Sequence, residues 1–181
     1  DEVEEIRKIL EELAREAEKV VRETRKLLED IRKEVEELND RNRRLLEELE
    51  RRVRDIKRRG TSEEKLKELE DRVEKAIRES REELKRLEDK IRKRIEEDRR
   101  KIEKLERKVK KVIDEIRKRT RRDEIRRVVE DVERRLRELL DRWRKVSEEV
   151  EKRLKELIDE LRESIERSAD RLRKLIEELK R

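Results

Sequence analysis

Apolar residues recur every 18 positions along the first third of the chain. Eighteen residues make five turns of an α-helix, so each series of recurring residues follows one line along a straight helix. This interval lies between the heptad repeat, which predicts left-handed supercoiling, and the 11-residue repeat, which predicts right-handed supercoiling. We therefore expect a straight, nearly untwisted helix over about residues 2–59, roughly 85 Å long. The series are Ile9, Leu27 and Leu45; Leu10, Leu28 and Leu46; Leu13, Ile31 and Leu49; Ala17, Val35 and Val53; and Val20, Leu38 and Ile56.

Two further parts of the chain repeat at the same interval, each in a new phase. They predict helices over about residues 62–119 and 122–180. The first contains the series Leu66, Leu84 and Ile102; Leu69, Leu87 and Leu105; Val73, Ile91 and Val109; and Ile77, Ile95 and Ile113. The second contains Leu136, Leu154 and Leu172; Leu139, Leu157 and Leu175; Leu140, Ile158 and Ile176; and Ile125, Trp143, Leu161 and Leu179.

A tight turn is predicted at about residues 60–61. Gly60 is the only glycine in a chain without proline, and glycine accepts the positive φ that commonly ends a helix. The cations at residues 57–59 oppose the negative end of the helix dipole. Thr61 or Ser62 can then cap the next helix through a side-chain oxygen.

A second turn is predicted at about residues 119–122, where the apolar phase is lost without a glycine. Thr120, with Asp123 three residues later, can cap the helix that follows. The competing interpretation is one continuous helix through Thr120.

Three helices of equal length joined by tight turns must run up, down and up. Each carries one apolar stripe about 100° wide, which suits contact with two neighbours and leaves no second face for another chain. The predicted fold is therefore all-α, a single-chain antiparallel three-helix bundle that forms one elongated domain over residues 1–181. We expect a monomer.

Polar residues replace apolar ones at several positions of the stripes. Folding the chain at residues 60 and 120 places residue n of the first helix level with about 121 − n and 120 + n on the other two. Two layers then collect polar side chains from all three helices. One contains Thr24, Asp98, Trp143 and Ser147, and the other contains Asn42, Ser80 and Ser164, with Asn39 and Ser168 nearby.

We interpret these layers as buried hydrogen-bond networks that fix helix pairing and register. A buried polar group without a partner costs about 1–3 kcal/mol, so clustering lets the groups satisfy one another. The alternatives are that Asp98 is a carboxyl poised for acid–base chemistry and that Trp143 stacks on a ligand. Because neither layer contains a second titratable residue, we favour the structural interpretation, with Trp143 filling core space.

The composition excludes most catalytic chemistry. Charged residues make up 64% of the chain, and its 61 basic and 55 acidic residues leave a net charge of only +6. The chain has no histidine, cysteine, tyrosine or methionine, which removes thiol nucleophiles, Ser–His pairs and metal sites with nitrogen or sulfur ligands. The Glu pairs could hold calcium weakly, but no loop organises them. We expect no enzyme activity, cofactor or metal.

No partner is expected either. The basic clusters at residues 99–101 and 117–122 lie beside acids, and compensation of the helix dipole accounts for the second, so specific nucleic-acid binding is not expected. The chain contains no run of about 20 apolar residues and no signal-peptide pattern, so we expect a soluble protein without a membrane span. The sequence leaves its compartment open.

The chain resembles computationally designed helical bundles, in particular long untwisted three-helix bundles with an 18-residue repeat. The resemblance covers the whole chain and is carried by the apolar series, the Gly60–Thr61–Ser62 turn, the Leu, Ile and Val core, and the Glu, Lys and Arg surface. It implies very high stability, designed hydrogen-bond networks, expression in the cytoplasm of a host cell and no natural function.

Two alternatives remain. A natural cytoskeletal rod of the spectrin type would normally contain His, Met, Phe and Tyr. A helical protein-interaction module would need exposed apolar anchors, which the pattern does not predict.

Overall fold

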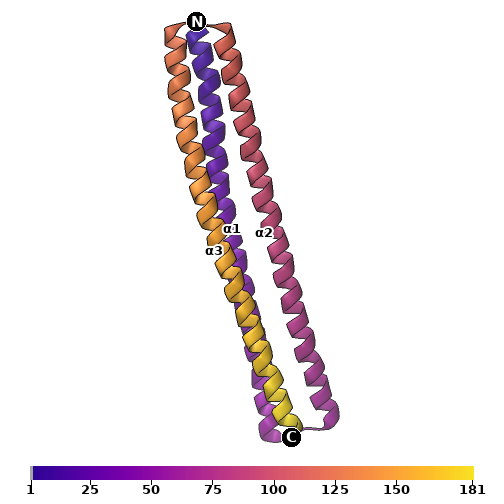
Figure 1. Ribbon diagram of the computed structural model, residues 1–181. Helices are drawn as coiled ribbons and strands as arrows, with labels where there is room; N and C mark the ends of the chain where they lie inside the picture. Colours follow the sequence, from indigo (N-terminus) through magenta and orange to yellow (C-terminus); the bar gives the residue numbers. More distant parts are fainter. Residues whose placement is uncertain (1) are drawn as a thin grey trace. The chain divides into compact units, whose positions relative to one another are not determined.

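Three α-helices make up the computed structural model, which describes residues 2–181. They are α1 (Glu2–Arg59), α2 (Glu63–Arg119) and α3 (Asp123–Lys180), joined by two short connections (Figure 1). Because α2 ends at Arg119, the interpretation as one continuous helix through Thr120 is wrong. The described residues contain no strand, so the expected all-α class is confirmed.

Contacts between side chains give the relative direction of α1 and α2. Thr24 bonds Asp98, and Glu16 bonds Lys108, so the partner's number rises on α2 as the residue number falls on α1. The two helices are therefore antiparallel. 

The third helix, α3, is antiparallel to α2 and parallel to α1. Glu74 and Arg81 of α2 bond Arg173 and Glu166 of α3, so the residue numbers run in opposite directions. Glu50 and Lys57 of α1 pair with Arg171 and Glu178, so there the numbers rise together. The fold is an up-down-up three-helix bundle, as expected.

Contacts divide the chain into two compact units, and each contains a stretch of all three helices. Unit 1 comprises residues 2–30 and Arg92–Lys152, and unit 2 comprises Ile31–Ile91 and Arg153–Arg181. A helix rises 1.5 Å per residue, so residues far apart on one helix share no neighbours and fall into different units. The prediction of a single domain over the whole chain stays a prediction.

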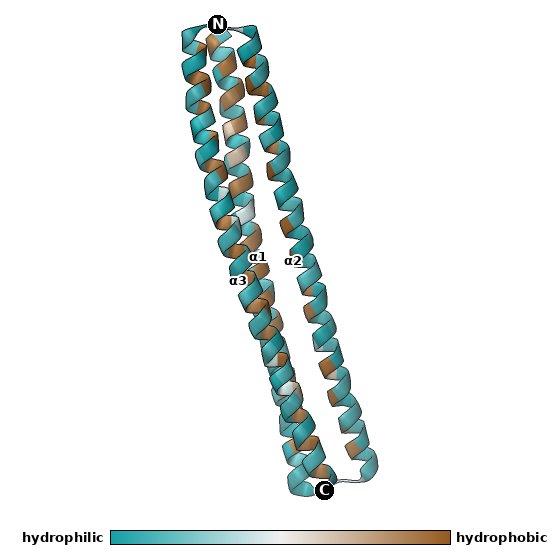
Figure 2. Ribbon diagram, in the orientation of Figure 1, coloured by the Kyte–Doolittle hydropathy of each residue, from teal (hydrophilic) through white to brown (hydrophobic). Residues whose placement is uncertain are grey.

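Each unit has an aliphatic core made from the apolar stripes of its three helix segments. In Figure 2 the hydrophobic positions recur along every helix among hydrophilic ones. Burying one Leu, Ile or Val side chain stabilises a fold by about 1.5–3 kcal/mol, so these stripes supply the main driving force. The core of unit 1 includes Leu10, Leu13, Ala17, Ile113, Val129 and Leu136, and that of unit 2 includes Leu49, Val53, Val73, Ile77, Leu172 and Ile176.

One edge of the α1 stripe is exposed. Ile9 and Leu45, which belong to one 18-residue series, have 46% and 39% of their surface exposed. The pattern places both residues on the apolar stripe and predicts no exposed apolar anchor, whereas the structure leaves these two side chains partly exposed. Their series lies at the border of the stripe, where the neighbouring helices cover it least.

The first connection depends on Gly60, which has a φ of 76°. Its N–H donates to the Ile56 carbonyl at 2.9 Å, which closes the end of α1. Of the two capping candidates, Ser62 caps α2: its hydroxyl accepts a hydrogen bond from the Lys65 N–H at 3.4 Å. The helix begins at Glu63, one residue later than predicted.

The second connection works without glycine because no non-glycine residue among those described has a positive φ. The Thr120 N–H donates to the Ile116 carbonyl at 3.2 Å, and the Thr120 hydroxyl accepts from the Arg122 N–H at 3.4 Å. The prediction that Thr120 caps the third helix is wrong, since its hydroxyl bonds within the connection. Asp123 is instead the first residue of α3, where its charge suits the positive end of the dipole.

Candidate functional site

Thr24, Asp98 and Trp143 form a buried hydrogen-bonded cluster in unit 1, with one residue from each helix. Thr24 is 2% exposed and Asp98 is 9% exposed. The Thr24 hydroxyl oxygen lies 2.8 Å and 2.7 Å from the two carboxyl oxygens of Asp98. The Trp143 indole N–H donates to the Thr24 hydroxyl at 2.9 Å and to the Asp98 Oδ2 at 3.2 Å. The structure thus brings three of the four residues of this predicted layer together.

Most hydrogen-bond donors and acceptors of the Thr24, Asp98 and Trp143 side chains are paired within the cluster. A threonine hydroxyl has one proton and two lone pairs, and an indole has only a donor. Thr24 also lies 2.9 Å from the Val20 carbonyl of its own turn, which is a second acceptor for its proton. Asp98 forms no ion pair with any described residue. The partners of Asp98 in the cluster, the Thr24 hydroxyl and the Trp143 indole, are both neutral. These contacts hold α1, α2 and α3 at one register in unit 1.

Trp143 combines this polar contact with core packing. Its ring lies in a small apolar cluster with Val21 and Ile102, flanked by Val20 and Leu140. The indole therefore fills core space between the helices, as expected from the sequence.

Ser147 does not join the cluster. It is half-buried, and no hydrogen bond links it to the other described residues of the layer. Ser147 lies one helical turn beyond Trp143, about 6 Å along the axis. The long indole spans the distance to Thr24, whereas the short serine hydroxyl does not.

The second predicted layer, in unit 2, is only partly formed. The Ser80 hydroxyl donates to the Asn42 Oδ1 at 3.2 Å, and both residues are buried. The Asn42 Nδ2 is buried and has no partner among the described residues. Ser164 is half-buried and forms no hydrogen bond there, so α3 contributes nothing to this pair. The prediction of a network from three helices is therefore wrong for this layer.

The two residues proposed to extend the second layer also lie outside it. Asn39 is exposed and Ser168 is half-buried. Asn39 lies beyond the edge of the α1 stripe, so its amide is solvated.

Two bidentate Arg–Glu pairs are among the ion pairs that join α2 to α3 on the surface of unit 2, and the sequence did not predict them. The Arg81 guanidinium donates to both carboxyl oxygens of Glu166 at 2.7 Å and 2.8 Å. Arg173 does the same to Glu74 at 2.8 Å and 3.0 Å. Both pairs use the fork geometry that makes Arg–carboxylate contacts strong.

These pairs shift the acids' titration. The hydrogen bond from Arg173 lowers the pKa of Glu74 from its ordinary 4.5, and the hydrogen bond from Arg81 lowers the pKa of Glu166 in the same way. The pKa of each arginine is raised, chiefly by the same hydrogen bond. Each carboxylate therefore stays charged at pH values where a free glutamate begins to protonate.

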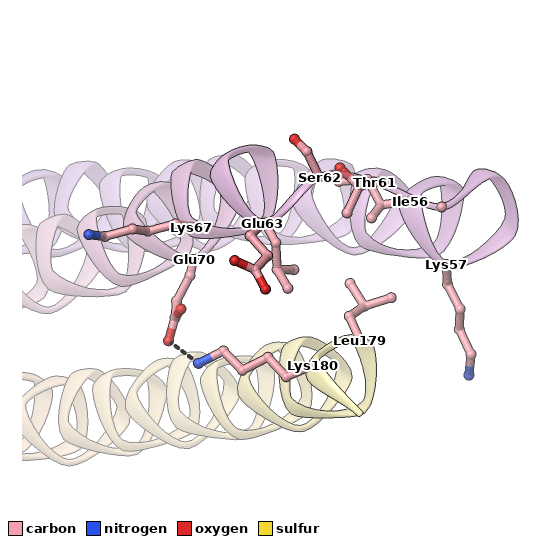
Figure 3. A pocket seen from close by; sticks show the side chains of 11 residues that line it. Ile56, Lys57, Thr61, Ser62, Glu63, Lys67, Glu70, Leu179 and Lys180 are labelled. Carbon is pink, nitrogen blue, oxygen red and sulfur yellow. Dashed lines mark hydrogen bonds and ion pairs between the residues drawn. The ribbon is translucent and has the colours of Figure 1, made fainter.

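A depression of about 650 Å³ lies at the first connection. Figure 3 shows Lys180 of α3 reaching towards Glu70 of α2, and the Lys180 Nζ lies 2.9 Å from the Glu70 Oε1. Ile56, Leu66 and Leu179 supply its apolar walls. None of the predicted polar-layer residues lines it, so it is separate from both clusters.

The described residues contain no group of three or more His, Cys, Asp or Glu side chains placed to hold a metal ion. Among the helices of residues 2–181, none is apolar over enough of its length to cross a membrane.

The sequence matches no family model and no curated protein. A solved structure described as "Computationally designed three helix bundle" is similar to it, with a TM-score of 0.63 and 21% sequence identity. The match covers 99% of this chain and 93% of that chain. The likeness, together with the contacts above, shows the fold: the chain is a three-helix bundle.

Proposed function

We propose that the chain is a structural scaffold: a designed helical bundle with no natural biochemical activity. The observation that carries this proposal is the Thr24–Asp98–Trp143 cluster. One polar residue from each helix bonds to the other two, which is the arrangement that specifies helix pairing and register. The only buried carboxyl of the clusters is thereby engaged in holding the bundle together.

Two features of the chain support the same proposal. The 18-residue repeat runs through all three helices with almost only Leu, Ile and Val in the apolar positions. The similar solved structure is described as designed. A regular repeat with a narrow choice of residues is what idealised design rules produce.

Asp98 has no catalytic role in this proposal. Its oxygens already accept hydrogen bonds from Thr24 and Trp143. A general acid or base must reach a substrate proton within about 2.6–3.2 Å, and the three helices enclose this carboxyl.

Thermal unfolding followed by circular dichroism tests the scaffold proposal. An idealised bundle is expected to show no cooperative unfolding below about 95 °C, within the range called hyperstable. Cooperative melting at about 45–65 °C, as in ordinary mesophilic domains, would overturn the proposal.

A helical protein-interaction module is the second candidate, because Ile9 and Leu45 are exposed on α1. The two residues are 36 positions apart, which corresponds to ten helical turns. Interaction hot spots cluster in one well-packed patch, and two separate side chains do not form one. This spacing favours the scaffold.

A further inference from the structure

Positive charge is concentrated at the connection between α2 and α3. Residues 117–127 contain seven arginines and lysines against two acids, a net charge of +5. The whole chain carries +6, so the remaining residues are nearly neutral. We call these seven cations the connection cluster: Arg117, Lys118, Arg119, Arg121, Arg122, Arg126 and Arg127.

Most of the connection cluster is not neutralised by ion pairs. Arg117 bonds Glu133 at 2.8 Å. The other six cations are exposed and form no ion pair with any described residue, including the acids Glu4 and Glu5 near the start of α1. Elsewhere the helices are bridged repeatedly by Arg–Glu and Lys–Glu pairs, such as Arg144–Glu106.

Helix dipoles account for only part of this cluster. Lys118 and Arg119 end α2, where cations oppose the negative end of the dipole. Arg121 and Arg122 precede α3, and Arg126 is the fourth residue of α3, so these cations lie at the positive end of its dipole. Cations there are unfavourable, and the sequence-based explanation by dipole compensation fails for them.

A depression of about 480 Å³ lies within the connection cluster. Arg117, Arg121 and Arg126 line it, together with Thr120, one acid, Glu130, and three apolar residues of the unit 1 core. Three arginines therefore line one hollow, two of them without an ion pair to any described residue, and guanidinium N–H groups are strong donors to phosphate oxygens. We propose that this depression and the surrounding cations form a binding site for a multivalent phosphate anion.

The proposal is tested by titrating the ¹⁵N-labelled protein with inorganic tripolyphosphate at low salt and following backbone amide signals. Binding is expected to move the signals of residues 116–130 and to weaken as salt screens the cluster. No shift at low salt, or shifts of similar size all along the chain, would overturn the proposal.

A matched pair of variants separates a site from general charge. The first is Arg121→Gln, Arg122→Gln, Arg126→Gln and Arg127→Gln; the control is Arg58→Gln, Arg59→Gln, Lys65→Gln and Lys67→Gln at the other connection. Each removes four positive charges, and circular dichroism checks that both fold. The first is expected to lose about tenfold or more in affinity, and the control less than about twofold. An equal loss in both would show that net charge alone attracts the anion, and the site would be refuted.

Discussion

At Thr24, one hydroxyl proton has acceptors on two sides: the Asp98 carboxyl and the Val20 carbonyl. Its oxygen also accepts from Trp143. A single side chain thus links three helices, and its loss leaves polar groups unpaired in the core. The Asn42 amide differs, because only its oxygen has a partner and its Nδ2 has none.

Thr24→Val is therefore expected to lower the free energy of unfolding by about 1–3 kcal/mol, since the shape is kept but Asp98 and Trp143 lose a partner. Guanidinium unfolding followed by circular dichroism measures the change. In an Asp98→Leu background the same substitution should cost less, because the buried carboxyl is already gone. The same cost in both backgrounds would mean that Thr24 and Asp98 are not coupled.

The double variant Asn42→Leu with Ser80→Ala should stabilise the protein. A buried donor without a partner destabilises a protein by about 1–3 kcal/mol, and the double variant removes this penalty. It also adds apolar contact in the core of unit 2. The unfolding midpoint in guanidinium should rise. A clear fall would show that the Asn42 amide is fully satisfied in solution.

At the level of the helices, the two connections reverse the chain direction with different backbone conformations. Gly60 ends α1 with a positive φ, whereas the residues between α2 and α3 keep negative φ values. A Cβ added at Gly60 would meet no atom within 4 Å, so a substitution there strains only the backbone.

Gly60→Ala is expected to destabilise the protein by about 1–2 kcal/mol, the cost of a left-handed conformation for an L-residue. Gly60→Asn should cost less, because asparagine tolerates this conformation. Denaturant unfolding of both variants measures the difference. Equal costs for alanine and asparagine would contradict a backbone origin.

The protein should lose stability in acid because two Arg–Glu pairs that join α2 to α3 break when their glutamates protonate. The pKa values of Glu74 and Glu166 are lowered below 4.5 in the folded protein. Their contribution is therefore present above 4.5, the unfolded value, and is lost as pH falls through the lower folded values. The variant Glu74→Gln with Glu166→Gln should show a smaller acid-induced fall in the guanidinium midpoint than the parent.

The matched control for this pH dependence is Glu47→Gln with Glu160→Gln, which removes two exposed glutamates that form no ion pair with a described residue. It should retain the parent's acid sensitivity. If both double variants respond alike, the Arg81 and Arg173 pairs do not cause the effect.

For the molecule as a whole, the repeat predicted the fold, the helix ends to within one residue, and the Thr24–Asp98–Trp143 cluster. It did so because an 18-residue series determines which residues share a helix face, and two turns determine which residues lie level. Ser147 and Ser164 were assigned to the wrong layers because the repeat gives a residue's height along the bundle and its helix face, but not the length of its side chain. A serine hydroxyl is too short to reach a neighbouring helix when the residue lies one helical turn away from its expected partners.

The interhelical ion pairs could not be predicted for a different reason. Nearly every exposed position is Glu, Lys or Arg, so the sequence offers many equivalent partners for Arg81 or Arg173. Only the relative placement of α2 and α3 selects Glu166 and Glu74. The monomeric state, the untwisted geometry and the high stability stay predictions.

Thr24, Asp98 and Trp143 join the three helices in one buried cluster. Hydrogen exchange of the Trp143 indole N–H tests it most directly, because this is the only tryptophan and gives one indole signal. This proton is expected to exchange only when the protein unfolds globally, with a free energy of opening close to that of unfolding. Exchange as fast as in an exposed tryptophan would contradict it.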